Sequence, residues 1–472
     1  MILSITSPAA GAVIASNATT VTVQGTSVQK VNGVAQPAQS FSVDVDVSKY
    51  PPGPVTLSLL NSSGDNATVS IKKQTSESAD GTTVTDGTSQ IVDANGDVWT
   101  LASGVTMKNG SPSSTHTGIT KLLYQNHIVN EFDGTNWWYY VGDPWRPIAD
   151  PRPVPTVGFY GINGHVGWGA PYTNLAAQIS AMLDLGMKTY RTGYDPGNGP
   201  GIRAFIQNYA QPAGIGVYAV ALPPQGAHAF NNNVAPASEA DGYNEGFRLG
   251  QDMANYLSGL VKAYEVGNEL CSYALRTDGS FNGDVPSHYD NTRFTIARGM
   301  IRGVIEGIRS IDKTTPFVGP ACLWLHYGFT NMLRNGTQPD GTSGHPLVDW
   351  DITAWHWYSD MGNMESAGNI SANVLNIIKG YGKPIWLTEY GVRQSLSGVE
   401  SDRTNYLTGA TCMADWVRVK NTYNIQHTCM YELYDDGKSG DEGAFGLVLN
   451  DGVTPKPTRY AAVKAFIAAN PL

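Results

Sequence analysis

The sequence has few charges, and basic residues are the scarcer kind. Charged side chains make up 15% of the 472 residues, and 30 lysines and arginines stand against 40 aspartates and glutamates, giving a net charge of −10. No basic patch appears, which argues against nucleic acid or an anionic membrane surface as a partner. No apolar run approaches the roughly 18 residues that a membrane-spanning helix needs. Neutral or cationic ligands fit this composition better.

Cysteine is also scarce. The four cysteines form no CxxC pair, so the sequence predicts neither a zinc site nor a disulfide framework. Cys271 and Cys322 each follow a predicted strand, which permits a bridge between them, but we expect free buried thiols. The start, "MILSITSPAAGAVIAS", lacks the basic segment of a signal peptide. We expect a secreted or periplasmic protein whose signal peptide is not part of this chain.

The first third of the chain is predicted to be all-β. Residues 1–74 alternate short β-rich runs with turn clusters, a pattern typical of an immunoglobulin-like β-sandwich. Residues 75–90, dominated by Ser, Thr, Gly and Asp, are expected to be a linker. Residues 91–152 show hairpin signals and form a predicted second, Trp-rich β module. Its tryptophans form either a sugar-stacking platform or the module's core and its seam with the next domain: Trp99, Trp137, Trp138 and Trp145.

From residue 153 to 472 strand and helix signals alternate, which indicates a parallel sheet with crossover helices. Two helices stand out, at 291–311 and 458–469. Eight strands in this length predict a (β/α)8 barrel, so the fold class is α/β with two small all-β modules in front. The predicted strands are 156–163, 188–193, 215–222, 261–266, 315–323, 349–360, 383–392 and 424–436.

Two of these strands end in a glutamate. "VKAYEVGNEL" runs into Glu269, and "KPIWLTEYGV" contains Glu389. Carboxylates at the carboxyl ends of barrel strands occupy the place where such barrels carry their chemistry. A pair of them suits glycosidic bond cleavage, in which one group protonates the leaving oxygen and the other attacks or stabilises the sugar carbon.

These motifs resemble those of the clan A retaining glycoside hydrolases. The resemblance covers about residues 156–472 and rests on "GNE" after the fourth strand, "TEYG" at the seventh, "HWY" at the sixth and an arginine ending the second. Within the clan the chain is most similar to glycoside hydrolase family 39, including bacterial exopolysaccharide hydrolases, and "YELYDDG" with "AFGLVLNDGVTPKPTRYAA" supports this. One departure is Leu270, where many relatives have proline.

The resemblance implies a role for each motif residue. Glu269 would be the general acid/base and Glu389 the nucleophile. Asn268 would contact the sugar 2-hydroxyl. Arg191 would hold Glu389 ionised, although Glu265 points to the same side as Glu269 and offers Arg191 a structural partner instead.

Further residues are candidates for substrate binding. His356 and Tyr358 alternate on one strand and share a face; the clan pattern makes Tyr358 a hydrogen-bond donor to the nucleophile and His356 a substrate contact, whereas a buried core histidine is the structural alternative. The remaining candidates are Asn163 and His165 after the first strand, the tryptophans Trp168, Trp324 and Trp357 near strand ends, and Glu432 on the last strand.

The sequence therefore predicts a retaining, endo-acting β-glycosidase on a bacterial exopolysaccharide or plant-wall glycan. An exo-acting β-xylosidase or β-glucuronidase is one alternative, and a carbohydrate-binding protein without activity is another. No metal or cofactor is expected, since the acidic loop "YDDGKSGDEG" fits no calcium-loop spacing. The sugar, its linkage and the oligomeric state are not predicted.

Overall fold

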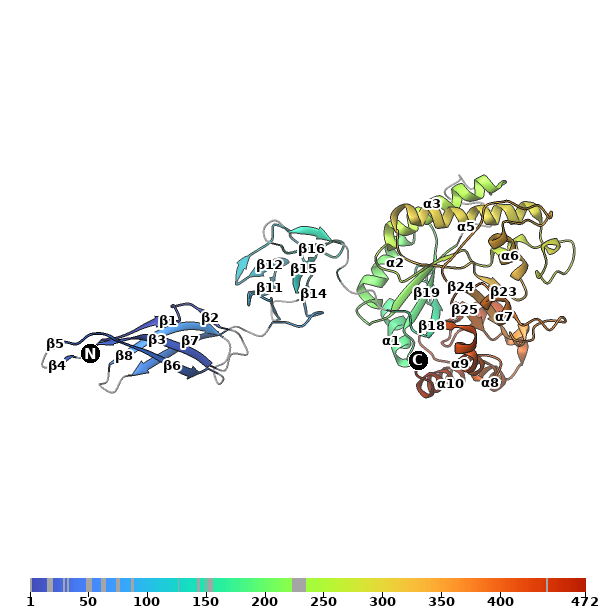
Figure 1. The fold of residues 1–472 in the computed structure, drawn as a ribbon. Coiled ribbons are helices and arrows are strands. Elements are labelled where there is room, and N and C mark those ends of the chain that lie inside the picture. The colour runs from blue at the N-terminus through green and yellow to red at the C-terminus, as the bar shows by residue number, and fades with distance from the viewer. Residues whose placement is uncertain are drawn as a thin grey trace. The chain divides into compact units, whose positions relative to one another are not determined.

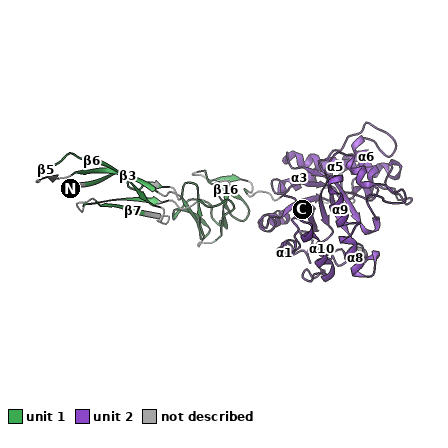
Figure 2. Ribbon diagram, turned by 60° about the horizontal axis from the view of Figure 1, so that its bottom comes forward, with its two compact units in different colours: residues 1–152 green, residues 153–472 purple. Residues whose placement is uncertain are grey.

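The computed structural model divides the chain into two compact units, Met1–Arg152 and Pro153–Leu472, which Figure 2 colours separately. The structure describes residues 2–14, 20–28, 30–31, 34–47, 53–60, 65–73, 77–85, 89–125, 127–141, 145–148, 151, 156–222, 235–438 and 440–472.

The first half of unit 1 consists of strands that alternate buried and exposed residues. Val21 and Val23 of one strand face inward with Leu57 and Ile71 of the opposing sheet, because every second side chain of a strand points the same way. An immunoglobulin-like topology stays a prediction for this half. One sheet has the order β1 (Ile2–Ser7), β3 (Thr20–Val28), β6 (Gln39–Asp46); another has β2 (Val13–Ile14), β8 (Asn66–Lys73), β7 (Gly53–Leu60); β4 (Lys30–Val31) pairs with β5 (Val34–Ala35).

The second half of unit 1 is also all-β in its described residues. Its first strand, β9 (Thr83–Val84), pairs with β14 and buries Val84 completely, so the prediction that 75–90 is only a linker is wrong for this part. Residues 75–76 and 86–88 of the predicted linker lie outside the described residues. The other strands are β10 (Ile91–Val92), β11 (Val98–Ala102), β12 (Val105–Lys108) and β13 (Ser111–Pro112) in one sheet, and β14 (Lys121–Gln125), β15 (Ile128–Phe132), β16 (Trp137–Tyr139) and β17 (Arg146–Ile148) beside β9 in the other.

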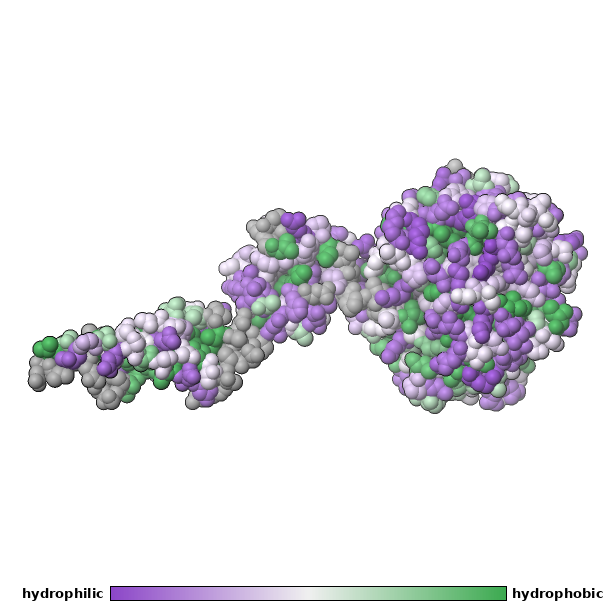
Figure 3. All heavy atoms as spheres, viewed as in Figure 1, coloured by the Kyte–Doolittle hydropathy of each residue, from purple (hydrophilic) through white to green (hydrophobic). Residues whose placement is uncertain are grey.

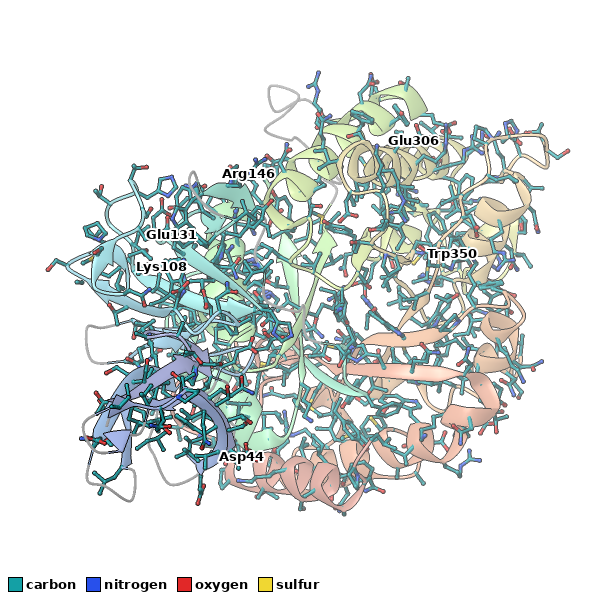
Figure 4. All side chains as sticks on the ribbon, turned by 60° about the vertical axis from the view of Figure 1, so that its left-hand side comes forward. Asp44, Lys108, Glu131, Arg146, Glu306 and Trp350 are labelled. Atoms are coloured by element: carbon teal, nitrogen blue, oxygen red, sulfur yellow. The ribbon has the colours of Figure 1, made fainter. Side chains whose placement is uncertain are left out.

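The tryptophans of this half belong to its core rather than to a surface platform. Trp99, Trp137 and Trp145 expose 0%, 2% and 7% of their surface, too little for stacking on a sugar. Trp138 is half-buried and stacks on His116, with ring centroids 4.2 Å apart. Behind it, the fully buried Glu131 accepts hydrogen bonds from the hydroxyls of Thr106 and Ser114 (Figure 4). These contacts favour the structural alternative for the tryptophans.

Unit 2 is built on a nine-stranded parallel sheet, visible in Figure 1. Its spatial order is β22, β21, β20, β19, β18, β26, β25, β24, β23. The strands span β18 (Tyr160–Gly164), β19 (Thr189–Tyr194), β20 (Gly216–Ala221), β21 (Tyr264–Val266), β22 (Phe317–Val318), β23 (Cys322–Leu323), β24 (Thr353–Tyr358), β25 (Ile385–Gly391) and β26 (Ile425–Met430).

The two ends of this sheet meet within one short segment. β22 and β23 are separated only by residues 319–321, and β22 pairs with β21 while β23 pairs with β24. Val318 also bridges to Ile352 just before β24. Counting β22 and β23 as one strand gives eight, in the circular order expected of a (β/α)8 barrel.

Helices cover the outside of the sheet, as Figure 1 shows. Figure 3 shows mainly polar side chains on the viewed face of this unit, with small apolar patches between them. Among the described residues, no helix has the length and apolar character to cross a membrane. The helices are α1 (Leu175–Leu185), α2 (Gly199–Phe205), α3 (Glu239–Leu257), α4 (Leu270–Ala274), α5 (Asn291–Ile311), α6 (Tyr327–Asn335), α7 (Val374–Lys379), α8 (Glu400–Thr408), α9 (Met413–Tyr423) and α10 (Pro457–Ala469).

Helices α3 and α5 approach each other unusually closely. A Cβ placed on Gly246 of α3 would lie within 3.0 Å of Met300 O, and one on Gly303 of α5 would lie within 3.0 Å of Tyr243 O. Only glycine allows backbones to approach in this way. The same relation holds for every glycine in two sets at four-residue spacing: Gly242, Gly246 and Gly250 on α3, and Gly299, Gly303 and Gly307 on α5.

Candidate active site

Glu269 follows the carboxyl end of β21, where the chain turns sharply into α4. Gly267 has φ 103° and Glu269 itself has φ 51°, so both adopt the left-handed region. That conformation is uncommon for a residue with a side chain and is found preferentially at functional sites. The Glu269 N–H donates to Ala321 O at 2.9 Å, which fixes the turn against the segment between β22 and β23. The Glu269 side chain is 29% exposed.

Glu389 lies within β25 and is nearly buried. The pairing of β25 with β26 shifts register between Leu387 and Tyr390, and such a bulge changes the direction of the side chains beside it. The Glu389 carboxylate accepts one hydrogen bond from Arg191 Nη1 and one from the Tyr358 hydroxyl, each at 2.6 Å. Its side chain is 8% exposed, in contrast to Glu269.

The two carboxylates come close together at the centre of the barrel end. One ligand oxygen of Glu269, one of Glu389 and a ring nitrogen of His356 all lie within 4.8 Å of one another. His356 Nδ1 lies 2.7 Å from Glu269 Oε1 and 3.4 Å from Glu389 Oε2. The imidazole therefore contacts both glutamates.

Charges around Glu389 keep it ionised. Burial raises the pKa of this carboxyl, but the positive charges of His356 and Arg191 and the hydrogen bond from Tyr358 together lower the pKa below its ordinary value. For His356, burial lowers the pKa, and the negative charge of Glu389 and the hydrogen bond to Glu269 raise it above its ordinary value. The surroundings of Glu389 therefore favour its ionised form.

Arg191 joins the residues at this centre. Besides Glu389, its guanidinium donates to Glu265 through Nε, to Asn163 Oδ1 at 2.7 Å and to Asn268 Oδ1 at 2.9 Å. Both roles that the sequence left open for Arg191 are therefore present at once. Glu265 Oε1, fully buried, has no hydrogen-bond partner among the described residues.

Asn163 and Asn268 differ in which side-chain atoms remain available to a substrate. The Asn163 side-chain amide donates to Thr388 O at 3.1 Å and Met430 O at 3.2 Å, while its oxygen is bound to Arg191. Asn163 is thus a buried link between strands, although it lines the cavity described next. Asn268 is half-buried and its oxygen is held by Arg191, which orients its amide.

A cavity of about 140 Å³ lies beside Glu389, and His165 and Trp168 of the loop after β18 line it. His165 Nε2 lies 2.9 Å from Glu432 Oε2, and the Tyr172 hydroxyl donates to the same oxygen at 2.7 Å. Trp168, 47% exposed, stacks on His165 with centroids 3.7 Å apart. The cavity is lined by Asn163, Gly164, His165, Trp168, Arg191, Gly193, Val220, Leu222, Asn268, Glu389 and Tyr431.

The tryptophans near β23 and β24 have different environments. Trp324 is half-buried, at φ 48°, and packs 5.9 Å from Trp357. Trp357 exposes none of its surface, and its indole N–H donates to Gly362 O at 2.7 Å. The prediction of a sugar platform is therefore wrong for Trp357, because it points away from His356 and Tyr358 into the packing behind the strand.

Sequence reasoning missed Tyr172 and Tyr431. Tyr172 holds Glu432, and Tyr431 lines the cavity. Tyr172 lies in the loop "GWGAPYTN", where no periodicity marks it. Tyr431 directly precedes Glu432, and its position beside that candidate was the available signal.

The three converging groups Glu269, His356 and Glu389 are also the described residues that lie close enough together to hold a metal ion. The sequence predicts no metal, and this stays a prediction. Arg191 and Tyr358 already donate hydrogen bonds to the two oxygens of Glu389.

Residues 322–453 match the model of the family described as Glycosyl hydrolase catalytic core. The matched segment contains Glu389, His356 and Tyr358, and it indicates that the chain is a glycoside hydrolase, which confirms the predicted enzyme class. No curated protein matches the sequence. Membership of family 39 stays a prediction.

Several solved structures are similar to about two thirds of this chain. Xylanase 10B of Thermotoga maritima has 14% identity and a TM-score of 0.46, covering 66% of this chain and 95% of that chain. A β-glucosidase of Exiguobacterium marinum has 14% identity and a TM-score of 0.47, with 67% and 98% covered. The virulence factor SghA of Agrobacterium tumefaciens, solved with its substrate analogue salicin, has 12% identity and a TM-score of 0.47, with 67% and 97% covered. At these values no function is transferred from them.

Proposed function

We propose that this protein is a retaining, endo-acting glycoside hydrolase that cleaves β-glycosidic bonds in a polysaccharide, with Glu389 as nucleophile and Glu269 as acid/base. The supporting observation is the short separation of the two carboxylates, whose nearest ligand oxygens lie within 4.8 Å. Retaining sites hold the carboxyls about 5–5.5 Å apart, whereas inverting sites leave about 6.5–9.5 Å for a water molecule.

The different surroundings of the two glutamates support the assignment of roles. Glu389 is buried, and the charges of His356 and Arg191 and the hydrogen bond from Tyr358 favour its ionised form, as a nucleophile requires. The Glu269 side chain contacts His356 but is more exposed than Glu389, so the leaving oxygen of a substrate can reach it. Glu269 would protonate that oxygen while Glu389 attacks the anomeric carbon, and would then activate the water that releases the sugar.

The sugar before the cleaved bond would lie in the cavity beside Glu389. His165 offers a hydrogen-bonding group and Trp168 a flat ring there, the fully buried Glu432 orients His165, and Asn268 would meet the 2-hydroxyl. Trp168 and Trp324, both with exposed surface, are the proposed platforms for further units, which is the basis for endo action on a bacterial exopolysaccharide or plant-wall glycan. We place the protein outside the cytoplasm, as a secreted or periplasmic enzyme.

The test is product analysis with matched variants. Incubation with xylans, glucans, mannans and bacterial exopolysaccharides should release oligosaccharides from one polymer, and the anomer first formed should retain the β configuration by NMR. Glu389→Gln should lose nearly all activity while keeping binding. Glu306→Gln, on the surface of α5 (Figure 4), is the control and should keep activity.

Other products would change the proposal. Release of monosaccharides alone would favour the exo-acting alternative. An inverted first product would refute the retaining mechanism. Tight binding of one polymer without any cleavage would favour the carbohydrate-binding alternative.

A further inference from the structure

Next to Glu269 lie two cysteines that the proposed mechanism does not use. Cys271 is in the first turn of α4, two residues after Glu269, and Cys322 begins β23. Both are fully buried and no disulfide joins them. The Cys322 thiol donates a hydrogen bond to the Cys271 sulfur. The contact is held by backbone, since Glu269 N–H donates to Ala321 O, the residue before Cys322.

A histidine completes this group. His326 Nδ1 lies 3.3 Å from Cys271 Sγ, and the ring is 6% exposed. Burial raises the pKa of Cys271, but the hydrogen bond from Cys322 and the charge and hydrogen bond of His326 lower the pKa to about 5. Burial and the neighbouring sulfur raise the pKa of Cys322 well above its ordinary value. The contact with His326 and the lowered pKa make Cys271 the attacking sulfur of the pair, with Cys322 beside it.

We propose that Cys271 and Cys322 are a site of reversible oxidation by peroxides, and that the disulfide formed between them lowers the activity by displacing Glu269. The effect on activity rests on the proposed function of Glu269 as acid/base.

The chemistry balances with hydrogen peroxide as the oxidant. The Cys271 thiolate attacks one peroxide oxygen, an S–O bond forms, the O–O bond breaks, and the departing hydroxide takes a proton to become water. Cys322 then attacks the Cys271 sulfur, the S–S bond forms, and the S–O bond breaks. The hydroxide released takes the proton of the Cys322 thiol. Overall the two sulfurs lose two electrons, and one peroxide becomes two waters.

Oxidation would change what positions Glu269. Cys271 would lose its hydrogen bond with His326 and be tied to β23 instead. The helix α4 is only five residues long and starts directly after Glu269, whose backbone is in the left-handed region. A shift of the first turn of α4 is therefore transmitted to the Glu269 side chain and to its contact with His356.

The experiment uses the full-length protein, reduced and then treated with hydrogen peroxide. Peptide mapping after alkylation should find a Cys271–Cys322 cross-link, hydrolysis of the responsive polymer should fall at least tenfold, and dithiothreitol should restore it. Cys322→Ala should give no cross-link, and its Cys271 sulfenic acid should be trapped by dimedone. Cys412→Ala, which removes another buried thiol, should behave as the wild type.

The peptide map shows whether the cross-link forms, and it does not require the protein to be active. Absence of the cross-link in the folded wild-type protein overturns the proposal, and this measurement does not depend on whether a variant folds. A cross-link that leaves hydrolysis unchanged overturns the regulatory effect. If no glycan is cleaved under any condition, the proposed function fails, while the map still tests the oxidation site.

Discussion

Replacing Tyr358 with phenylalanine tests how Glu389 is kept ionised. The Tyr358 hydroxyl donates to Glu389 Oε2 at 2.6 Å, and Tyr358→Phe removes that bond with almost no change in shape. A hydrogen bond to a charged group contributes about 1.5–3 kcal/mol. If this free energy stabilises the ionised carboxylate, its loss raises the pKa of Glu389 by roughly one to two units, since one unit is about 1.4 kcal/mol.

The direction of the change in pH dependence follows from the proposed role of Glu389 as nucleophile. The nucleophile must be ionised, so activity falls as the pH drops through its pKa, which the surroundings hold below the ordinary value. Raising that pKa moves the acidic limb of kcat/KM to higher pH by the same one to two units. Near neutral pH Glu389 stays ionised in the variant, but Tyr358 no longer orients its carboxylate. We expect kcat/KM to fall there by up to about 10- to 150-fold, which is the change in rate that corresponds to the free energy of the lost hydrogen bond.

The assay is kcat/KM over the pH range for Tyr358→Phe, the wild type and a control. Tyr406→Phe on α8 is the matched control, because the buried Tyr406 hydroxyl has no hydrogen-bond partner among the described residues. Its profile should superimpose on that of the wild type. An acidic limb that does not move in Tyr358→Phe would show that Tyr358 does not stabilise the ionised nucleophile, and would refute the reasoning.

Three other predictions concern charge and packing. Arg191→Lys is expected to lower kcat/KM by at least tenfold in steady-state assays, because a lysine ammonium cannot reproduce four directed contacts; equal rates would contradict this. The pKa of Glu389 in the folded protein lies below its ordinary value of about 4.5, so ionised Glu389 stabilises the fold above about pH 4.5. This contribution is lost as the pH falls through the lowered pKa. The melting temperature of Glu389→Gln should therefore fall less steeply with acid than that of the wild type. Gly246→Ala is expected to lower the melting temperature by a few degrees, because overpacking costs about 1–3 kcal/mol, while Gly201→Ala on α2, where nothing lies within 4 Å, should not lower it.

The sequence predicts the parts of the site that depend on strand ends. Strands that finish in Glu269 and Glu389 had to meet at one end of a parallel sheet, and the expected helix 291–311 coincides with α5. Strand limits were less well predicted: 261–266 shortens to Tyr264–Val266, and 349–360 shortens to Thr353–Tyr358. Burial on both sides of parallel strands removes the alternation that would mark where each one begins.

Other features depend on contacts between distant segments. Alternation along β24 already predicts that Trp357 and His356 face opposite sides of the strand. The sequence does not show that the side of Trp357 is completely covered. The sequence does not decide between two acidic partners for Arg191, because only the fold shows that both Glu265 and Glu389 reach it. The Glu432 environment depends on Tyr172, which lies 260 residues away in the chain. Such pairings come from the closure of the barrel, which a single sequence does not reveal.

The close contact between α3 and α5 has a consequence for finding relatives of this protein. The glycines of α3 and α5 each repeat every fourth residue, and along the chain α3 precedes β21 and Glu269 while α5 follows α4. Any larger residue at these positions forces the backbones apart, so evolution has little freedom there once the two helices have adopted this spacing. A search for two such glycine triplets on either side of an Asn-Glu dipeptide should therefore identify distant chains that share this half of the barrel, even where overall identity is too low to be informative.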